Sequence, residues 1–134
     1  MTDEQEIEAI LERVTESFSN LDLVAWSNCF HPARLIVTPK GTRSPTTQAE
    51  CEQVMKSTVE FLQSRNFVKS VLDYYQIHLL SDYSAVVSTV WSRFDKDDKL
   101  IHRFGTTYFF TKEHGRWAIS LLTSHSADKK IAAV

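Results

Sequence analysis

Arg93, His102 and His125 are the residues whose types and spacing best suit chemistry on an anion or a proton. An arginine presents a planar fork of N–H donors that fits a carboxylate or a phosphate. A histidine gains or loses a proton near neutral pH, so His102 and His125 are the candidate catalytic residues, as acid or base. The competing interpretation is a solvated sheet end, where the acidic turn 95–98 neutralises Arg93. The hairpin register decides whether the three side chains meet.

The hairpin register follows from the loop lengths if each loop is a two-residue turn. A turn at 97–98 places Arg93 opposite His102 and Trp91 opposite Phe104. Directly opposed residues of an antiparallel pair share one face of the sheet. These four side chains are therefore predicted to form one wall.

The two flanking hairpins extend this wall. A turn at 82–83 places Tyr74 opposite Trp91, and the last turn places His102 opposite His125 unless a β-bulge shifts that register by one residue. A concave wall of aromatic rings with a few polar groups is typical of a small-molecule site, although the rings suit a core beneath helices equally well. The predicted ligand-binding residues, beside the two histidines, are Tyr74, Gln76, His78, Trp91, Arg93, Phe104, Tyr108, Leu121 and Thr123.

The predicted wall lacks the residues that most metal and cofactor sites need. His102 and His125 could share a metal, but no Asp or Glu on that face supplies a third ligand. The chain has only three glycines and no phosphate-cradling loop, and no serine sits in a nucleophile elbow. We therefore expect neither a metal nor a cofactor, and only the histidines could act as bases.

The elements that must position this wall change character halfway along the chain. Apolar residues first recur at helical spacing, with capping boxes at Thr2 and Thr47 and a cap at Asp22. His31-Pro32 is expected to end the second helix, before a short strand at 35–38. The period then becomes two, which predicts four sequential antiparallel strands at about 68–80, 85–95, 100–112 and 116–126. The sequence therefore predicts an α+β fold in which three helices close over a curved antiparallel sheet.

Composition excludes several other classes of protein. The 134 residues, 43% hydrophobic and 24% charged, suit a single globular domain spanning 1–134. The net charge is −2 and the Lys and Arg residues form no basic stripe, so we expect no nucleic-acid partner. No apolar run approaches the roughly 20 residues that cross a bilayer, so we expect no membrane partner, and the acidic start is unlike a signal peptide. With Cys29 and Cys51 interpreted as buried free thiols, we expect a cytoplasmic protein.

Two segments resemble a known superfamily. The segment 21–32, which begins Leu-Asp-Leu-Val-Ala-Trp, and the turn Gly115-Arg116-Trp117-Ala118-Ile119 are similar to the opening and the ending of nuclear transport factor 2-like proteins, especially the SnoaL-like group. The resemblance implies a cone whose Trp117 face lies beneath the helices. It leaves function open, because this fold hosts isomerases, cyclases, dehydratases, epoxide hydrolases and association domains. Ketosteroid isomerase-like members carry a general-base aspartate before a proline, whereas here Thr38 precedes Pro39.

The opposite face of the sheet is mildly apolar, and no remaining segment is predicted to cover it. An uncovered apolar face indicates a partner. Members of the superfamily often dimerise there, so the resemblance implies a symmetric homodimer through this outer face. Its predicted apolar residues are Val86, Val90, Phe94, Ile101, Phe109 and Leu122.

Three functions remain open from the sequence. The first is a non-catalytic pocket protein that binds a small, partly aromatic or anionic molecule. The second is an isomerase, dehydratase or cyclase with His102 or His125 as the acid–base and Tyr108 or Tyr74 as a hydrogen-bond donor. The third is an association module that works through the outer sheet face.

Overall fold

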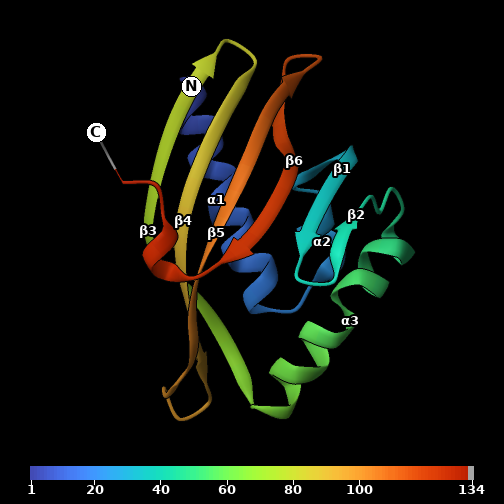
Figure 1. Ribbon diagram of the computed structural model, residues 1–134, viewed down its shortest axis with the longest axis vertical. Coiled ribbons are helices and arrows are strands. Elements are labelled where there is room, and N and C mark those ends of the chain that lie inside the picture. The colour runs from blue at the N-terminus through green and yellow to red at the C-terminus, as the bar shows by residue number, and fades with distance from the viewer. Residues whose placement is uncertain (133–134) are drawn as a thin grey trace.

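Helices cover one side of a curled six-stranded sheet in the computed structural model, which describes residues 1–132 (Figure 1). The strand order is β2-β1-β6-β5-β4-β3. The predicted α+β class, the three helices and the curved sheet are confirmed. Within residues 1–132, each helix is too short or too polar to cross a membrane. The elements are α1 Asp3–Ser19, α2 Leu23–Ser27, β1 Phe30–Thr38, β2 Gly41–Arg43, α3 Gln48–Ser64, β3 Phe67–Ser81, β4 Ser84–Asp95, β5 Leu100–Glu113, β6 Arg116–His125 and the 3-10 turn η1 Ala127–Lys129.

The helices begin at the predicted caps. Thr2 accepts a hydrogen bond from the backbone N–H of Gln5, and the Gln5 side chain accepts one from the N–H of Thr2, which completes a capping box. The side chains of Asp22 and Thr47 cap α2 and α3. The second half of the predicted box at Thr47 is wrong, because Glu50 accepts from the N–H of Thr46 instead. The caps satisfy N–H groups that a helix start leaves without partners.

The second helix is shorter than predicted, because the chain enters the sheet directly after it. Phe30 already pairs with Ile119 of β6, so His31 lies inside β1 and not at a helix end. The imidazole of His31 is buried, and its Nε2 lies 2.8 Å from the carbonyl oxygen of Thr111. β1 runs parallel to β6, so the sheet is mixed, and its other strand pairs are antiparallel as predicted.

The central hairpin has the predicted register and the hairpin before it does not. In β4 and β5, Arg93 lies opposite His102 and Trp91 opposite Phe104, as expected. In β3 and β4 the turn joins Ser81 to Ser84 as expected, but an irregularity next to the turn then shifts the pairing by one residue. Side chains alternate between faces along a strand, so a one-residue shift reverses them. The prediction that Tyr74, Gln76 and His78 face inward is therefore wrong.

The last hairpin departs from the predicted register twice. Its turn is His114-Gly115, one residue later than predicted, and both residues have positive φ, 52° and 75°. That pair of angles is the signature of a tight hairpin turn whose twist matches the strands. A second irregularity, between Phe109 and Phe110, then moves the rest of β6 by one residue. Leu122 and Ser124 consequently face inward, whereas Leu121, Thr123 and His125 face outward, contrary to prediction.

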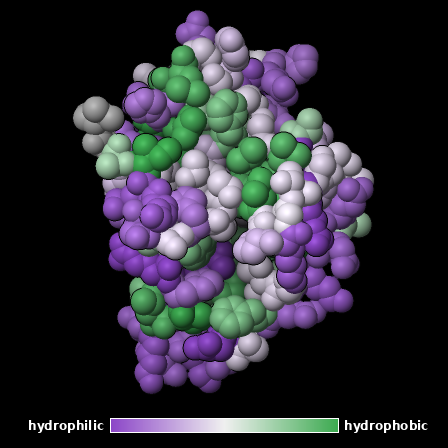
Figure 2. Space-filling model, viewed as in Figure 1, coloured by the Kyte–Doolittle hydropathy of each residue, from purple (hydrophilic) through white to green (hydrophobic). Residues whose placement is uncertain are grey.

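The C-terminal segment 126–131 lies across part of the outer sheet face (Figure 1), so the expectation that no segment covers this face is wrong. The N–H of Ile131 donates to the hydroxyl of Ser88 at 2.8 Å, and the Tyr74 hydroxyl donates to the carbonyl of Ile131 at 3.0 Å. Ser88 is buried as a result. In the same view, Figure 2 shows hydrophobic groups separated by hydrophilic ones on this face. The outer face is therefore partly closed by the chain itself.

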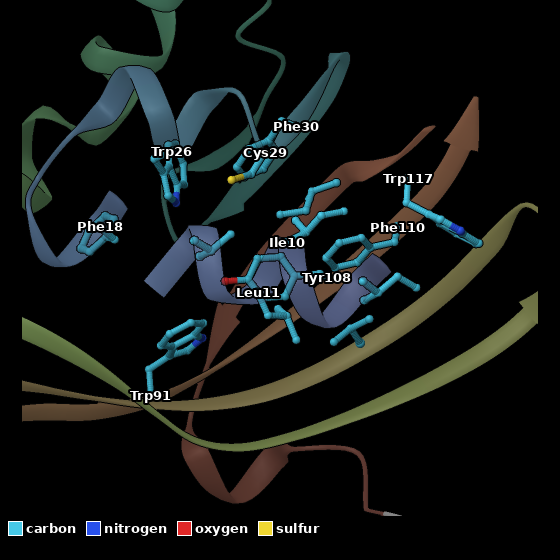
Figure 3. Packing of buried hydrophobic residues seen from close by; sticks show 14 of the residues in the cluster. Ile10, Leu11, Phe18, Trp26, Cys29, Phe30, Trp91, Tyr108, Phe110 and Trp117 are labelled. Atoms are coloured by element: carbon cyan, nitrogen blue, oxygen red, sulfur yellow. The ribbon is translucent and has the colours of Figure 1, made fainter. Parts of the chain in front are cut away.

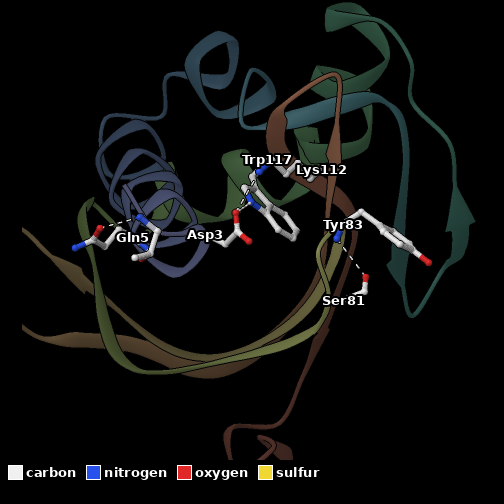
Figure 4. A network of polar contacts seen from close by, with 7 residues as sticks. Asp3, Gln5, Ser81, Tyr83, Lys112 and Trp117 are labelled. Atoms are coloured by element: carbon white, nitrogen blue, oxygen red, sulfur yellow. Dashed lines mark hydrogen bonds and ion pairs between the residues drawn. The ribbon is translucent and has the colours of Figure 1, made fainter.

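The core lies between α1 and the concave side of the sheet. Figure 3 shows Ile10, Leu11, Tyr108 and Phe110 packed there, with Trp117 at one end. The indole N–H of Trp117 donates to Asp3 at 2.9 Å, and Lys112 lies 3.3 Å from the same oxygen (Figure 4). Trp117 therefore packs beneath the helices, as the resemblance implies, and joins the start of α1 to β5 and β6.

Candidate functional site

A cavity of about 440 Å³ lies between the helices and the concave side of the sheet. It falls within the size range of small-molecule pockets. The strands supply its floor and α3 contributes side chains from the opposite side. Most of its surface is apolar, and its aromatic residues are Phe18, Trp26, Phe61, Trp91, Phe104 and Tyr108.

Arg93 is the one arginine or lysine among the described residues that line this cavity. Its Cζ atom lies 4.4 Å from the ring centroids of both Phe18 and Phe104. Its Nε is buried without a hydrogen-bond acceptor. Within residues 1–132, no carboxylate lies within 4.0 Å of its guanidinium nitrogens. Burial lowers the pKa of Arg93 to about 10, which leaves the guanidinium charged at neutral pH.

The acidic turn does not neutralise Arg93, so the competing interpretation of a solvated, neutralised sheet end is wrong. The Asp95 carboxylate accepts the backbone N–H groups of Asp97 and Lys99 at 2.9 and 3.0 Å. Asp98 pairs instead with Lys69 at 3.1 Å. The positive charge of Arg93 therefore faces the cavity without a protein counter-ion among the described residues.

His102 is the second polar group at this end of the cavity. Arg93 donates from Nη1 to Nε2 of His102 at 3.2 Å. A guanidinium only donates, so Nε2 must be the accepting nitrogen and the proton of the neutral ring sits on Nδ1. Burial lowers the pKa of His102, and the charges of Arg93 and Arg65 lower it further. His102 is therefore a neutral imidazole at pH 7.

Trp91 and Tyr108 point from the sheet toward the helices (Figure 3), as predicted. The indole N–H of Trp91 donates to the Thr89 hydroxyl at 2.8 Å, and that hydroxyl donates to the Thr106 carbonyl at 2.7 Å. Burial raises the pKa of Tyr108, so its hydroxyl stays protonated. Both rings also belong to the buried core, so they serve as packing and as cavity wall.

The structure brings five of the predicted site residues to the cavity and places six elsewhere. Those at the cavity are Trp91, Arg93, His102, Phe104 and Tyr108. His125 hydrogen-bonds Thr107 at 2.8 Å on the outer side, so the predicted grouping of Arg93 with both histidines is reduced to Arg93 and His102. The residues that lie outside the cavity, on the outer side, are Tyr74, Gln76, His78, Leu121, Thr123 and His125.

Sequence reasoning missed cavity residues on the helices and on the last strand. Phe18 belongs to the apolar stripe of α1, and Phe61 follows Thr58 by three residues on α3. Helical spacing therefore could have predicted that both side chains face the sheet. Leu122 and Ser124 were hidden by the irregularity in β6, which alternation alone does not reveal. Thr38, at the position of the ketosteroid isomerase-like aspartate, also lines the cavity.

The chemistry of the cavity is defined by one cation, one neutral imidazole and several hydroxyls. No Asp or Glu among residues 1–132 lines it. The same residues contain no group of three or more His, Cys, Asp or Glu that could hold a metal ion. The arrangement can therefore hold an anionic group beside aromatic rings, and His102 can accept a proton at Nε2 when Arg93 releases that nitrogen.

The helix-covered, curled sheet with a cavity beneath is the cystatin-like architecture of NTF2-like proteins. The sequence matches the family described as NTF2-like protein (DUF6841) over residues 3–127, and the chain belongs to that family. No curated protein matches the sequence.

Solved structures with low sequence identity share this fold. An NTF2-like protein with a cystatin-like fold from Novosphingobium aromaticivorans is similar with a TM-score of 0.76 and 13% identity, over 95% of this chain and 83% of that one. A protein of unknown function from Nostoc punctiforme gives 0.74 and 14%, over 91% and 89%. An NTF2-like protein of unknown function from Shewanella oneidensis gives 0.70 and 18%, over 92% and 98%. At these identities the likeness concerns the fold alone.

Proposed function

We propose that this chain binds a small, partly aromatic or anionic molecule in the cavity beneath the helices. The observation that carries the proposal is the 440 Å³ cavity with six aromatic side chains and a few polar groups at one end. Apolar walls stabilise a ligand by removing its surface from water, and the polar groups fix its orientation. The cavity has no carboxylate base among the described residues, so binding without turnover is the function it suits best.

Ligand-induced stabilisation tests this proposal. A library of small aromatic and aliphatic molecules is screened by thermal unfolding, and each hit is measured by calorimetry. A ligand at 100 times its Kd stabilises the native state by about 2.7 kcal/mol. Thr58→Trp fills the cavity from α3 and should abolish binding, whereas Gln63→Trp on the exposed side of the same helix should not. Hits that bind both variants equally, or a library without hits, contradict the proposal.

A second candidate, proton-transfer catalysis, rests on His102. When a bound molecule takes over the Nη1 donor of Arg93, Nε2 of the neutral His102 becomes free to accept a proton from that molecule, and the protonated Tyr108 hydroxyl is able to donate a hydrogen bond to it. If His102→Ala retains every activity that the protein shows on a hit from the screen, this candidate fails. Replacement of His125 on the outer side should have no effect on turnover.

The homodimer implied by the resemblance is a separate proposal about the outer face. Segment 126–131 covers part of that face, and Val86, Phe94, Phe109 and Leu121 remain half-buried there. Their apolar surface is the part available for association. Light scattering on the full chain between 1 and 100 µM, roughly the range of weak to moderate association, should show a dimer. A monomer throughout that range contradicts it.

A further inference from the structure

We propose that the ligand of the cavity is a carboxylic acid, whose carboxylate pairs with Arg93 while a flat hydrocarbon body lies among the aromatic rings. This inference rests on the proposed function and names the chemical class of the ligand. It follows from the charge, the hydrogen bonds and the surroundings of Arg93.

The first step is the missing counter-ion. A guanidinium taken out of water is costly unless it is paired and its N–H groups are satisfied. Arg93 has one side-chain acceptor, the imidazole of His102, and its Nε has none. Of the nearest acidic residues along the chain, Asp95 accepts backbone N–H groups of the turn and Asp98 pairs with Lys69. An anion that enters the cavity supplies both the charge and the acceptors that the described residues do not.

The second step is the kind of anion. The cavity presents one fixed positive charge, since His102 is neutral, and a single charge matches a monoanion. A phosphate monoester carries nearly two negative charges near neutral pH, so it would leave one charge unpaired in a largely apolar space. A carboxylate carries one, and its two oxygens fit the planar fork of an arginine.

The third step is the body of the ligand. Arg93 contacts Phe18 and Phe104, and Trp91 and Tyr108 line the same cavity. A carboxylate bound to Arg93 therefore has aromatic surface immediately beside it. Aromatic rings favour offset or edge-to-face contact with other flat groups. An aryl or polyunsaturated acid satisfies both the charge and the walls.

The test compares three aromatic acids with their neutral amides. Benzoate, 2-naphthoate and indole-3-acetate are titrated by calorimetry at pH 7.5 beside benzamide, 2-naphthamide and indole-3-acetamide, with 2-naphthyl phosphate as a third class. A hydrogen bond to a charged group is worth about 1.5–3 kcal/mol, so at least one acid should bind roughly 10- to 100-fold more tightly than its amide. The phosphate should bind more weakly than the matching acid.

Two variants assign the preference to Arg93. Arg93→Met should remove the difference between acid and amide, and Arg93→Lys should keep only part of it because an ammonium lacks the planar fork. Arg103→Met is the matched control, because Arg103 lies on the outer side of β5 near Asp73 and should leave the preference unchanged. If Arg93→Met does not fold, the wild-type and Arg93→Lys titrations still decide the question.

Failure of this inference and failure of the proposed function give different results. Amides that bind as well as the acids, a phosphate that binds more tightly, or a preference that survives Arg93→Met overturns the carboxylate assignment and leaves a cavity that binds other molecules. The same conclusion follows if only neutral members of the screening library bind. If neither the acids nor any library member binds, the proposed function itself fails.

Discussion

Arg34 is buried and Arg93 is half-buried, and in both the Nε is buried without an acceptor, yet the two side chains occupy different surroundings. Arg34 donates from Nη1 to the carbonyl and hydroxyl oxygens of Ser27, at 3.2 and 2.7 Å, and to Sγ of Cys51 at 3.1 Å. It thereby joins the end of α2, the strand β1 and the first turn of α3. Arg93 has a single side-chain acceptor and faces the cavity.

The comparison shows that burial does not by itself identify a functional arginine. The acceptors of Arg34 come from two helices, α2 and α3, so its side chain contributes to holding both helices to β1. Arg93 has one side-chain acceptor for its several N–H donors, so its side chain contributes little to the stability of the native state. A buried cation whose hydrogen bonds the fold leaves incomplete is the better candidate for a ligand contact.

Arg34→Met is expected to have the largest effect on stability. The change leaves the buried oxygens of Ser27 without the Arg34 donor and removes one of the two donors to Sγ of Cys51, and an unsatisfied buried group costs about 1–3 kcal/mol. We expect the free energy of unfolding in urea to fall by about 2–4 kcal/mol. A loss below about 1 kcal/mol would mean that Arg34 does not hold α2, β1 and α3 together.

Cys51→Ala should have the next largest effect, because it removes one of the three acceptors of Arg34 and a small buried volume. Cys29→Ala is the matched control, since Cys29 is also a buried free thiol but has no contact with Arg34. We expect Cys51→Ala to cost about 1 kcal/mol more than Cys29→Ala in chemical unfolding. Equal losses would show that the contact between Sγ and the guanidinium contributes nothing.

Arg93→Met should change stability by less than about 1 kcal/mol in either direction, because a hydrophobic residue of similar length replaces a poorly satisfied buried charge. The rings of Phe18 and Phe104 can pack on the methionine side chain. Chemical unfolding beside Arg34→Met gives the comparison directly. If Arg93→Met costs as much as Arg34→Met, the two arginines have the same structural role and the contrast is lost.

The sequence predicted the wall around Arg93 because two local deviations cancel. The loop after β4 closes between Asp95 and Lys99, not around a two-residue turn, and an irregularity at Phe94 restores the predicted register. Trp91, Arg93, His102 and Phe104 therefore lie where the simple rule places them. The helices were also predictable, since their caps and apolar stripes are local features.

Each site residue that was assigned to the wrong face lies beyond a register shift in its strand pair. The alternation of apolar and polar residues does not reveal such shifts. One shift beside the turn of β3 sends Tyr74 and His78 to the outer face, and one in β6 sends His125 there. The position of a bulge depends on how the sheet curls around the helices, which is a property of the whole fold. The role of Arg34 was missed for the same reason, because its partners come from segments far apart in the chain.

The smallest expected effect concerns the pH dependence of stability, and it tests whether His102 belongs with Arg93. Burial and the charge of Arg93 lower the pKa of His102 in the folded state, whereas the unfolded value is about 6.5. The unfolded chain therefore binds the proton more readily, so this contribution to stability is present above pH 6.5 and is lost as the pH falls below it. Urea unfolding at pH 7.5 and 5.5 measures the decrease in the free energy of unfolding on acidification, called here the acid loss. This acid loss should be smaller in His102→Gln than in the wild type.

A matched control separates the effect of His102 from that of replacing a histidine elsewhere in the chain. His78→Gln changes an exposed histidine on the outer face and should keep the wild-type acid loss. The double variant Arg93→Met with His102→Gln should behave as His102→Gln alone, whereas Arg93→Met by itself should reduce the acid loss, because the neighbouring charge is gone. If Arg93→Met has the same pH dependence of stability as the wild type, the charge of Arg93 does not contribute to the lowered pKa of His102, and the contrast between the two arginines loses this support.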